Sequence, residues 1–143
     1  MRVAVLCGGS SYERAVSLRS GAAVEQALRQ LGHEPVVLDT GASLSNDLSS
    51  GGFDCAVIAL HGRGGEDGSV QQILDLLGIP YTGSRPWPCE LAYDKVRAKR
   101  ALVAAGVFTP PFVALSAVAI NEFGAGDVLA ETVAELGLPV VVK

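Results

Sequence analysis

The sequence has few cysteines, no excess of basic residues and no long apolar run. Only 3 of its 143 residues are cysteine and none form a C-x-x-C pair, so we expect reduced thiols and neither a disulfide framework nor a zinc site. A net charge of -4 offers no basic surface to a nucleic acid, which excludes that class of partner from our expectations. No apolar run approaches the roughly 20 residues that span a bilayer, and the N-terminal one is shorter than a signal-peptide core of about 7–15 residues. We therefore expect a cytoplasmic protein with no membrane partner.

What the sequence does contain is a regular alternation of strand-like and helix-like segments. Hydrophobic residues make up 49% of the chain, which is typical of a globular protein. Val24, Ala27, Leu28 and Leu31 follow the i, i+3, i+4, i+7 spacing of an amphipathic helix. Strands that are apolar throughout and linked by helices predict an α/β fold with a parallel sheet covered on both faces. The pattern predicts strands at 2–6, 34–39, 54–61 and 79–84, helices at 12–31 and 69–77, and a polar connection at 41–52.

The pattern changes after residue 84. A connector broken by prolines covers 85–95, and helices are predicted at 94–105 and 127–136. The chain stops in the apolar strand "PVVVK", with nothing after Lys143 for that strand to pair with. We therefore expect the chain to be part of a longer protein. The alternative, that this last strand joins the first sheet and completes one domain, stays open.

Three segments follow predicted strands, and ligands of open parallel sheets bind at the carboxyl ends of strands. The Gly8-Gly9 pair before a helix is a possible anion site, although the G-x-G-x-x-G spacing is absent. Asp39 stands where a ribose-binding acid would be expected. A non-catalytic module that binds a nucleotide or small molecule is therefore one interpretation.

Glu13 has two possible roles. Ser10-Ser11-Tyr12-Glu13 fits the capping box, in which the glutamate accepts from the Ser10 N–H, and taken alone the sequence favours this role. A carboxylate at a helix start is also well suited to hold an ammonium group. The sequence alone does not decide between them.

The third segment, "HGRGGEDG" from His61 to Gly68, contains four glycines. Glycines around His61 and Glu66 leave room for a ligand or a closing lid, and Asp67 is placed to cap the next helix. No second ligand lies at metal-binding spacing from His61, so no metal site is expected in this segment. Lys143 ends an apolar strand, and because a buried lysine needs a partner, a nucleotide phosphate is one candidate.

Several motifs together resemble a known family. They are "GGSSYERAVSLRSG", "HGRGGEDGSVQQILDLLGIPYTGS", "DKVRAK", "GVFTP" and "LGLPVVVK", and they cover essentially the whole chain. In this order they resemble the N-terminal part of the D-alanine–D-alanine ligases, which are ATP-grasp enzymes of peptidoglycan synthesis. The resemblance implies a Rossmann-like, substrate-side domain at 1–86, then a connector and the first part of an ATP-grasp central domain at 87–143.

The resemblance also implies roles for individual residues. Glu13 would be the catalytic-site acid that anchors the ammonium group of the first D-alanine. Val16, Ser17 and His61 would complete that substrate site. Lys95 and Lys143 would reach ATP, and Glu66 would contact the closing loop.

The implied reaction joins two D-alanines through an acyl phosphate formed with ATP. Mg²⁺ ligands would lie beyond residue 143, so the chain alone is expected to be inactive. A homodimer is implied, and the second substrate, whether D-alanine, D-serine or D-lactate, stays open, as does another ATP-grasp ligase with different substrates. The sequence departs from the family pattern at Ala15, where a second acid is usual, and at Cys89-Glu90 in the connector.

Overall fold

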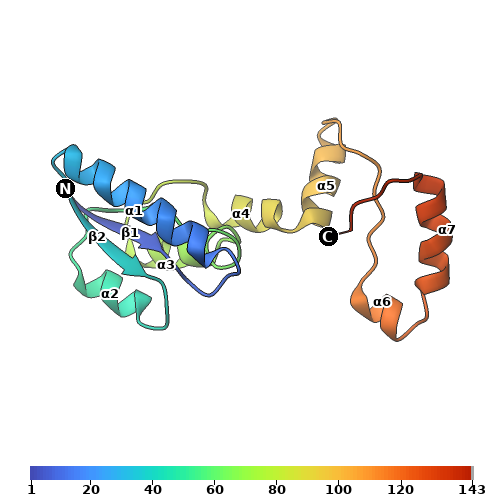
Figure 1. The fold of residues 1–143 in the computed structure, drawn as a ribbon, viewed down its shortest axis with the longest axis horizontal. Helices are drawn as coiled ribbons and strands as arrows, with labels where there is room; N and C mark the ends of the chain where they lie inside the picture. The colour runs from blue at the N-terminus through green and yellow to red at the C-terminus, as the bar shows by residue number, and fades with distance from the viewer. Residues whose placement is uncertain (143) are drawn as a thin grey trace. The chain divides into compact units, whose positions relative to one another are not determined.

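Figure 1 shows the computed structural model of the protein, which describes residues 1–142 and, at residue 127, the backbone alone. The chain forms two compact units, Met1–Lys95 and the residues from Val96 onward. The first unit holds a parallel sheet with its helices, and this confirms the predicted α/β class. None of the described helices is long and apolar enough to cross a membrane.

The sheet has three parallel strands in the order β2-β1-β3. β1 (Arg2–Cys7) lies in the middle, and β2 (Glu34–Asp39) and β3 (Cys55–Ile58) pair with it on either side. Val5 stands opposite Val37 of β2 and Val57 of β3. Because it is flanked on both sides, β1 is the most deeply buried strand of the sheet.

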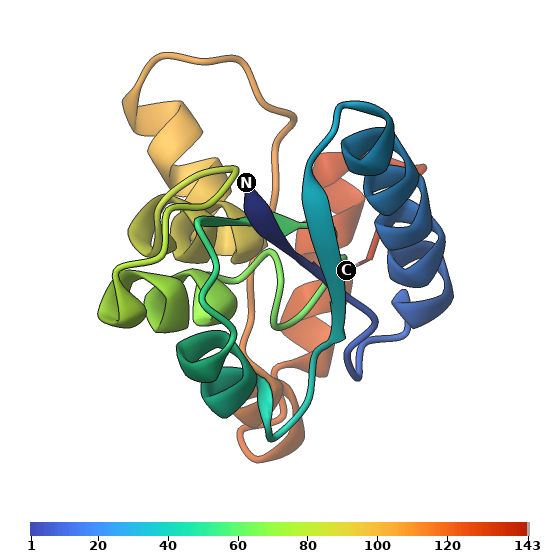
Figure 2. The same cartoon turned by 90° about the vertical axis from the view of Figure 1, so that its left-hand side faces the viewer.

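Helices cover both faces of the sheet, as the all-apolar strands predicted (Figures 1 and 2). Successive residues of β1 point to opposite faces. Val5 and Cys7 pack against Val24 and Leu28 of α1 (Arg14–Gln30). The other face packs against α2 (Leu44–Ser50) and α3 (Ser69–Leu77), and its core is Ala4, Leu6, Leu44, Leu48, Ala56, Val70 and Leu74.

A glycine sets how closely α1 approaches β1. A Cβ added to Gly21 would lie 2.7 Å from the Sγ atom of Cys7, closer than real contacts allow. The missing side chain therefore lets the helix backbone rest directly on the strand. Burial, assisted by the negative charge of Asp39, raises the pKa of the Cys7 thiol.

Two predicted connections are helical instead. Residues 41–52 contain α2, whose Leu44 and Leu48 are four residues apart and buried on one helix face. The predicted connector contains α4 (Pro86–Tyr93), because a proline at the first helical position has no N–H to leave unpaired. α4 lies within the first unit and contacts α3, where Gln72 Nε2 donates to Glu90 Oε1 over 2.7 Å. The domain boundary after residue 86 stays a prediction.

Two predicted strands do not form as expected. Residues 79–84 make a single bridge, between Tyr81 and Ala56, in place of a full strand.

In the second unit, α5 (Lys95–Ala104) begins at the boundary and α6 (Ala117–Asn121) and α7 (Gly126–Leu136) follow. Residues 139–142 are not in a strand, since no strand is described beside them to take their backbone hydrogen bonds. Lys143 lies outside the described residues.

Candidate functional site

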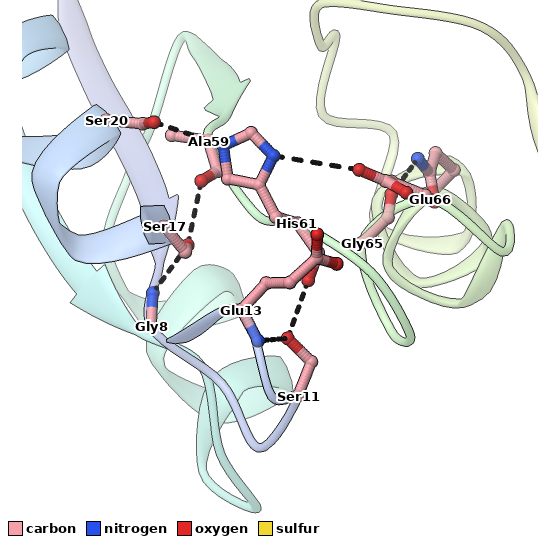
Figure 3. A network of polar contacts seen from close by, with 10 residues as sticks. Gly8, Ser11, Glu13, Ser17, Ser20, Ala59, His61, Gly65 and Glu66 are labelled. Atoms are coloured by element: carbon pink, nitrogen blue, oxygen red, sulfur yellow. Dashed lines mark hydrogen bonds and ion pairs between the residues drawn. The ribbon is translucent and has the colours of Figure 1, made fainter. Parts of the chain in front are cut away.

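A buried serine ties together the segments that follow β1 and β3. Ser17, on the second turn of α1, accepts a hydrogen bond from the Gly8 N–H at 2.9 Å. Its hydroxyl donates to the carbonyl of Ala59 at 2.8 Å. Gly8 follows β1 and Ala59 follows β3, so two strand ends and one helix start are fixed to each other (Figure 3). The candidate site lies at this carboxyl edge of the sheet.

The Gly8-Gly9 turn is already occupied by protein groups. Gly8 N–H donates to Ser17, and Gly9 N–H donates to Asp39 Oδ1 at 3.1 Å. Both terminal nitrogens of Arg14, Nη1 and Nη2, donate to the Asp39 carboxylate. Arg14 first, and the Gly9 N–H second, lower the pKa of Asp39 to about 2. A phosphate on the glycines or a ribose on Asp39 would have to displace these bonds, so the nucleotide-binding interpretation of these residues is not favoured.

Glu13 begins α1 with its carboxylate unpaired. It is the N-cap residue but makes no side-chain capping bond, so the predicted capping box is wrong. Its own N–H instead donates to Ser11 Oγ at 3.2 Å. Within residues 1–142 no hydrogen bond or ion pair engages the Glu13 carboxylate, which lies against Gly62. An exposed, unpaired carboxylate at a helix N-terminus is available to a cationic ligand.

Ser11 links the start of α1 to the glycine-rich segment. Its hydroxyl accepts from the Glu13 N–H and donates to the His61 carbonyl at 2.7 Å. This bond joins residues 50 positions apart. Glu13 and His61 therefore belong to one site, as Figure 3 shows.

The His61 ring lies between two side chains. Its Nε2 atom is 3.0 Å from Ser20 Oγ on α1, and its Nδ1 atom is 3.6 Å from Glu66 Oε1. The ring is 36% exposed, so one part of it faces the open site. An unpaired acid beside a fixed imidazole can bind an amino group and present a polar wall next to it.

Known proteins are similar to this chain in sequence and in fold. A sequence model described as "D-ala D-ala ligase N-terminus" matches residues 39–84. The D-alanine–D-alanine ligase of Moorella thermoacetica is 46% identical over 143 residues, which is 100% of this chain and 46% of that protein. The crystal structure of D-alanine–D-alanine ligase from Aeromonas hydrophila has a TM-score of 0.78 at 28% identity, covering 98% of this chain and 60% of that one. Over its whole length, this chain is similar to part of the D-alanine–D-alanine ligases.

A second solved relative bears on the cofactor. The D-alanine–D-alanine ligase of Bacillus anthracis, crystallised with ATP, is 32% identical with a TM-score of 0.70, covering 87% of this chain and 45% of that one. The chain spans about half the length of the curated ligases it matches. The sequence model that matches describes the N-terminal part of these ligases.

The ligase resemblance named four residues of an amino-acid site. The structure brings Glu13 and His61 together, and Val16 lies one turn into α1 with 42% of its surface exposed. Ser17 is fully buried, and both of its hydrogen bonds hold strand ends. Direct substrate contact by any of the four stays a prediction.

The two lysines named for ATP lie elsewhere in the chain. Lys95 Nζ is 5.7 Å from the centroid of the Tyr93 ring, at the end of the first unit. Lys143 lies outside the described residues. Their roles toward ATP therefore stay predictions.

The glycine-rich segment is shaped by Asp67. Its carboxylate accepts from the N–H groups of Gly64 at 3.0 Å and Ser69 at 3.1 Å. Partial burial acts to raise the Asp67 pKa, but these N–H groups outweigh it and lower the pKa. The N-cap residue of α3 is Gly68, so the prediction that Asp67 is the N-cap is wrong. Asp67 lies one residue before the N-cap and still accepts from the first N–H of the helix, that of Ser69.

A cavity of about 290 Å³ lies behind Glu66, and among its lining residues are Leu60, Gln71, Thr82 and Cys89. Neither Glu13 nor His61 lines this cavity. We therefore assign the candidate site from the unpaired Glu13 carboxylate and not from the cavity. Across residues 1–142, with residue 127 left aside, no three His, Cys, Asp or Glu side chains gather as a metal site would require. The described residues therefore do not form a Mg²⁺ site of their own.

Sequence reasoning missed Ser11 and Ser20. Ser20 had a readable signal, because positions 13, 17 and 20 follow the i, i+4, i+7 spacing that places them on one helix face. Ser11 had none, since its contact with the His61 carbonyl joins segments that only the folded sheet brings together.

Proposed function

We propose that this chain is the substrate-side part of a D-alanine–D-alanine ligase, in which Glu13 binds the ammonium group of the first D-alanine. The observation that carries the proposal is the unpaired Glu13 carboxylate lying against Gly62 and beside His61. A charge-assisted hydrogen bond between this carboxylate and an ammonium group would hold the amino acid by its nitrogen. The apolar Val16 and the His61 ring would line the rest of the site.

In the proposed reaction, the carboxylate of the first D-alanine attacks the γ-phosphorus of ATP and releases ADP, which gives an acyl phosphate. The amino group of the second D-alanine attacks the acyl carbon, phosphate leaves, and a proton is lost from the new amide nitrogen. Glu13 orients the first substrate through both steps without changing its own protonation. Such positioning lowers the barrier because the reacting groups no longer search for their geometry.

The phosphate-binding groups of the reaction are proposed from the family. We infer that Lys95 and Lys143 approach ATP and that Glu66 contacts a closing loop. Mg²⁺ would neutralise phosphate charge when bound, and its ligands are expected beyond residue 143. Support comes from the ATP complex of the Bacillus anthracis relative.

The assembly and location are proposed on the same basis. We infer a cytoplasmic homodimer, whose mass light scattering of the full-length protein would give directly. A monomer at working concentration would contradict the dimer and leave the proposed reaction untouched. The second substrate stays open among D-alanine, D-serine and D-lactate.

The test is phosphate release by the full-length protein with ATP and D-alanine as the sole amino acid. We expect release that depends on D-alanine, together with a product carrying one new amide bond in the mass spectrum. L-alanine at the same concentration is the control. ATP binding without D-alanine-dependent release would favour a non-catalytic module, and release with other substrates alone would favour another ATP-grasp ligase.

A further inference from the structure

Each nitrogen of the His61 ring faces one protein side chain. Ser20 Oγ lies 3.0 Å from Nε2, and Glu66 Oε1 lies 3.6 Å from Nδ1 (Figure 3). A neutral imidazole carries its hydrogen on one nitrogen and a lone pair on the other. The position of the ring hydrogen therefore depends on what Ser20 and Glu66 can donate or accept.

Glu66 favours a hydrogen on Nδ1. An ionised carboxylate can only accept hydrogen bonds, so it attracts an N–H and repels a bare lone pair. At 3.6 Å the contact is longer than a hydrogen bond and acts through charge alone. In the other tautomer the Nδ1 lone pair would point at the carboxylate, and the two electron-rich groups would repel each other.

Ser20 fits the same choice. A hydroxyl can donate or accept, so it donates to Nε2 once the hydrogen is on Nδ1. A helical serine often donates to a carbonyl of the preceding turn instead. Among the described residues, the hydrogen-bond partner of the Ser20 hydroxyl is His61.

We propose that Glu66 selects the His61 tautomer with its hydrogen on Nδ1 and that Ser20, by donating to Nε2, holds the ring in place, which makes Ser20 a positioning residue for the first amino-acid site. The ring is then fixed at both ends, between α1 and the segment at 61–68. The His61 ring beside Glu13 therefore keeps one orientation when the substrate binds. The positioning role rests on the proposed function, whereas the tautomer itself does not.

The ring nitrogens can be observed directly. Full-length protein labelled with ¹⁵N-histidine gives long-range ¹H–¹⁵N spectra in which protonated and bare ring nitrogens differ, and His61→Gln identifies the His61 signals. At a pH where the ring is neutral, we expect a protonated Nδ1 and a bare Nε2. Glu66→Ala increases the share of the opposite tautomer. Ser20→Ala leaves the tautomer unchanged but shifts the Nε2 resonance because its hydrogen bond is lost, whereas Ser20→Thr keeps the hydroxyl and the native pattern. The matched control is Ser49→Ala on α2, whose hydroxyl donates only to the carbonyl of Asn46.

Kinetics supply the second readout. Loss of one hydrogen bond should lower kcat/KM for the first D-alanine by about twofold to tenfold in Ser20→Ala, with the KM for ATP unchanged and recovery in Ser20→Thr. A wild-type ring protonated on Nε2, or an unchanged share of the two tautomers in Glu66→Ala, overturns the proposal. The wild-type spectrum tests the tautomer assignment even if a variant fails to fold. The expected ring pattern in a protein that does not use D-alanine would overturn the proposed function and leave the tautomer assignment standing.

Discussion

Gly62 lies directly against the carboxylate of Glu13. A Cβ added to Gly62 would stand 2.5 Å from Glu13 Oε2, and the Gly62 backbone has a positive φ of 72°. The segment after β3 therefore leaves open the space that the free acid occupies. A glycine is needed after His61 because a side chain there would collide with the Glu13 carboxylate. A general need for a flexible backbone explains this position less well.

Gly62→Ala should weaken the first amino-acid site. The new methyl group forces the Glu13 carboxylate to move, so part of its charge-assisted bond is lost and the KM for the first D-alanine should rise by about tenfold. Steady-state kinetics of phosphate release would measure this change. Gly64→Ala is the control, because Gly64 also has a positive φ, 90°, but nothing lies within 4 Å of an added Cβ. Equal effects of the two variants on KM would mean that backbone strain, and not the Glu13 contact, is responsible.

Glu13→Gln should lower substrate affinity without unfolding the protein. The amide keeps the shape but loses the charge, which removes about 1.5–3 kcal/mol of binding, or roughly tenfold to a hundredfold in affinity. Because no described group bonds to the carboxylate, the free energy of unfolding should change by less than about 1 kcal/mol. Titration calorimetry and urea unfolding measure the two quantities. Glu25→Gln, further along α1, is the control for loss of one negative charge from the same helix, and equal binding losses in both would remove the specific role of Glu13.

The Arg14–Asp39 pair should make stability depend on acid pH. Asp39 has a folded-state pKa of about 2 against 3.8 in the unfolded chain, so its contribution is complete above pH 3.8 and is lost as the pH falls through about 2. Wild-type protein should therefore have a higher Tm than Asp39→Asn at pH 5, with the difference shrinking toward pH 2. Thermal melts across this range test it. In an Arg14→Met background the difference should be small at every pH, and a difference that grows on acidification would contradict the assignment.

Leu74 and Leu76 of α3 offer a matched pair for the core. Leu74 is fully buried among residues of the sheet and α2, whereas Leu76 is 87% exposed. Leu74→Ala should lower the free energy of unfolding by about 2–5 kcal/mol through lost contacts and a cavity. Leu76→Ala should change it by less than about 0.5 kcal/mol. Urea unfolding followed by circular dichroism measures both, and similar losses would mean that α3 does not pack as described.

The parts of the fold that the sequence predicted are those with a strong periodic signal. The first three strands and α1 and α3 were found because their apolar residues either run continuously or repeat on one face. α2 was missed because it exposes polar residues around two anchors, Leu44 and Leu48. α4 was missed because Pro86 was taken to break a helix that it begins. The capping box failed because Glu13, and not Ser10, is the N-cap of α1, and the Glu13 N–H donates to Ser11.

The close seating of α1 on the sheet has a chemical consequence. Cys7 is 1% exposed, and Gly21 covers its sulfur, so an alkylating reagent reaches this thiol only when the helix lifts away. Cys55 and Cys89 are partly exposed and offer no such barrier. We therefore expect Cys7 to react more slowly than the other two thiols, at a rate set by the opening of the helix that carries Ser17 and Ser20. A ligand that stabilises the packed helix should slow this reaction further.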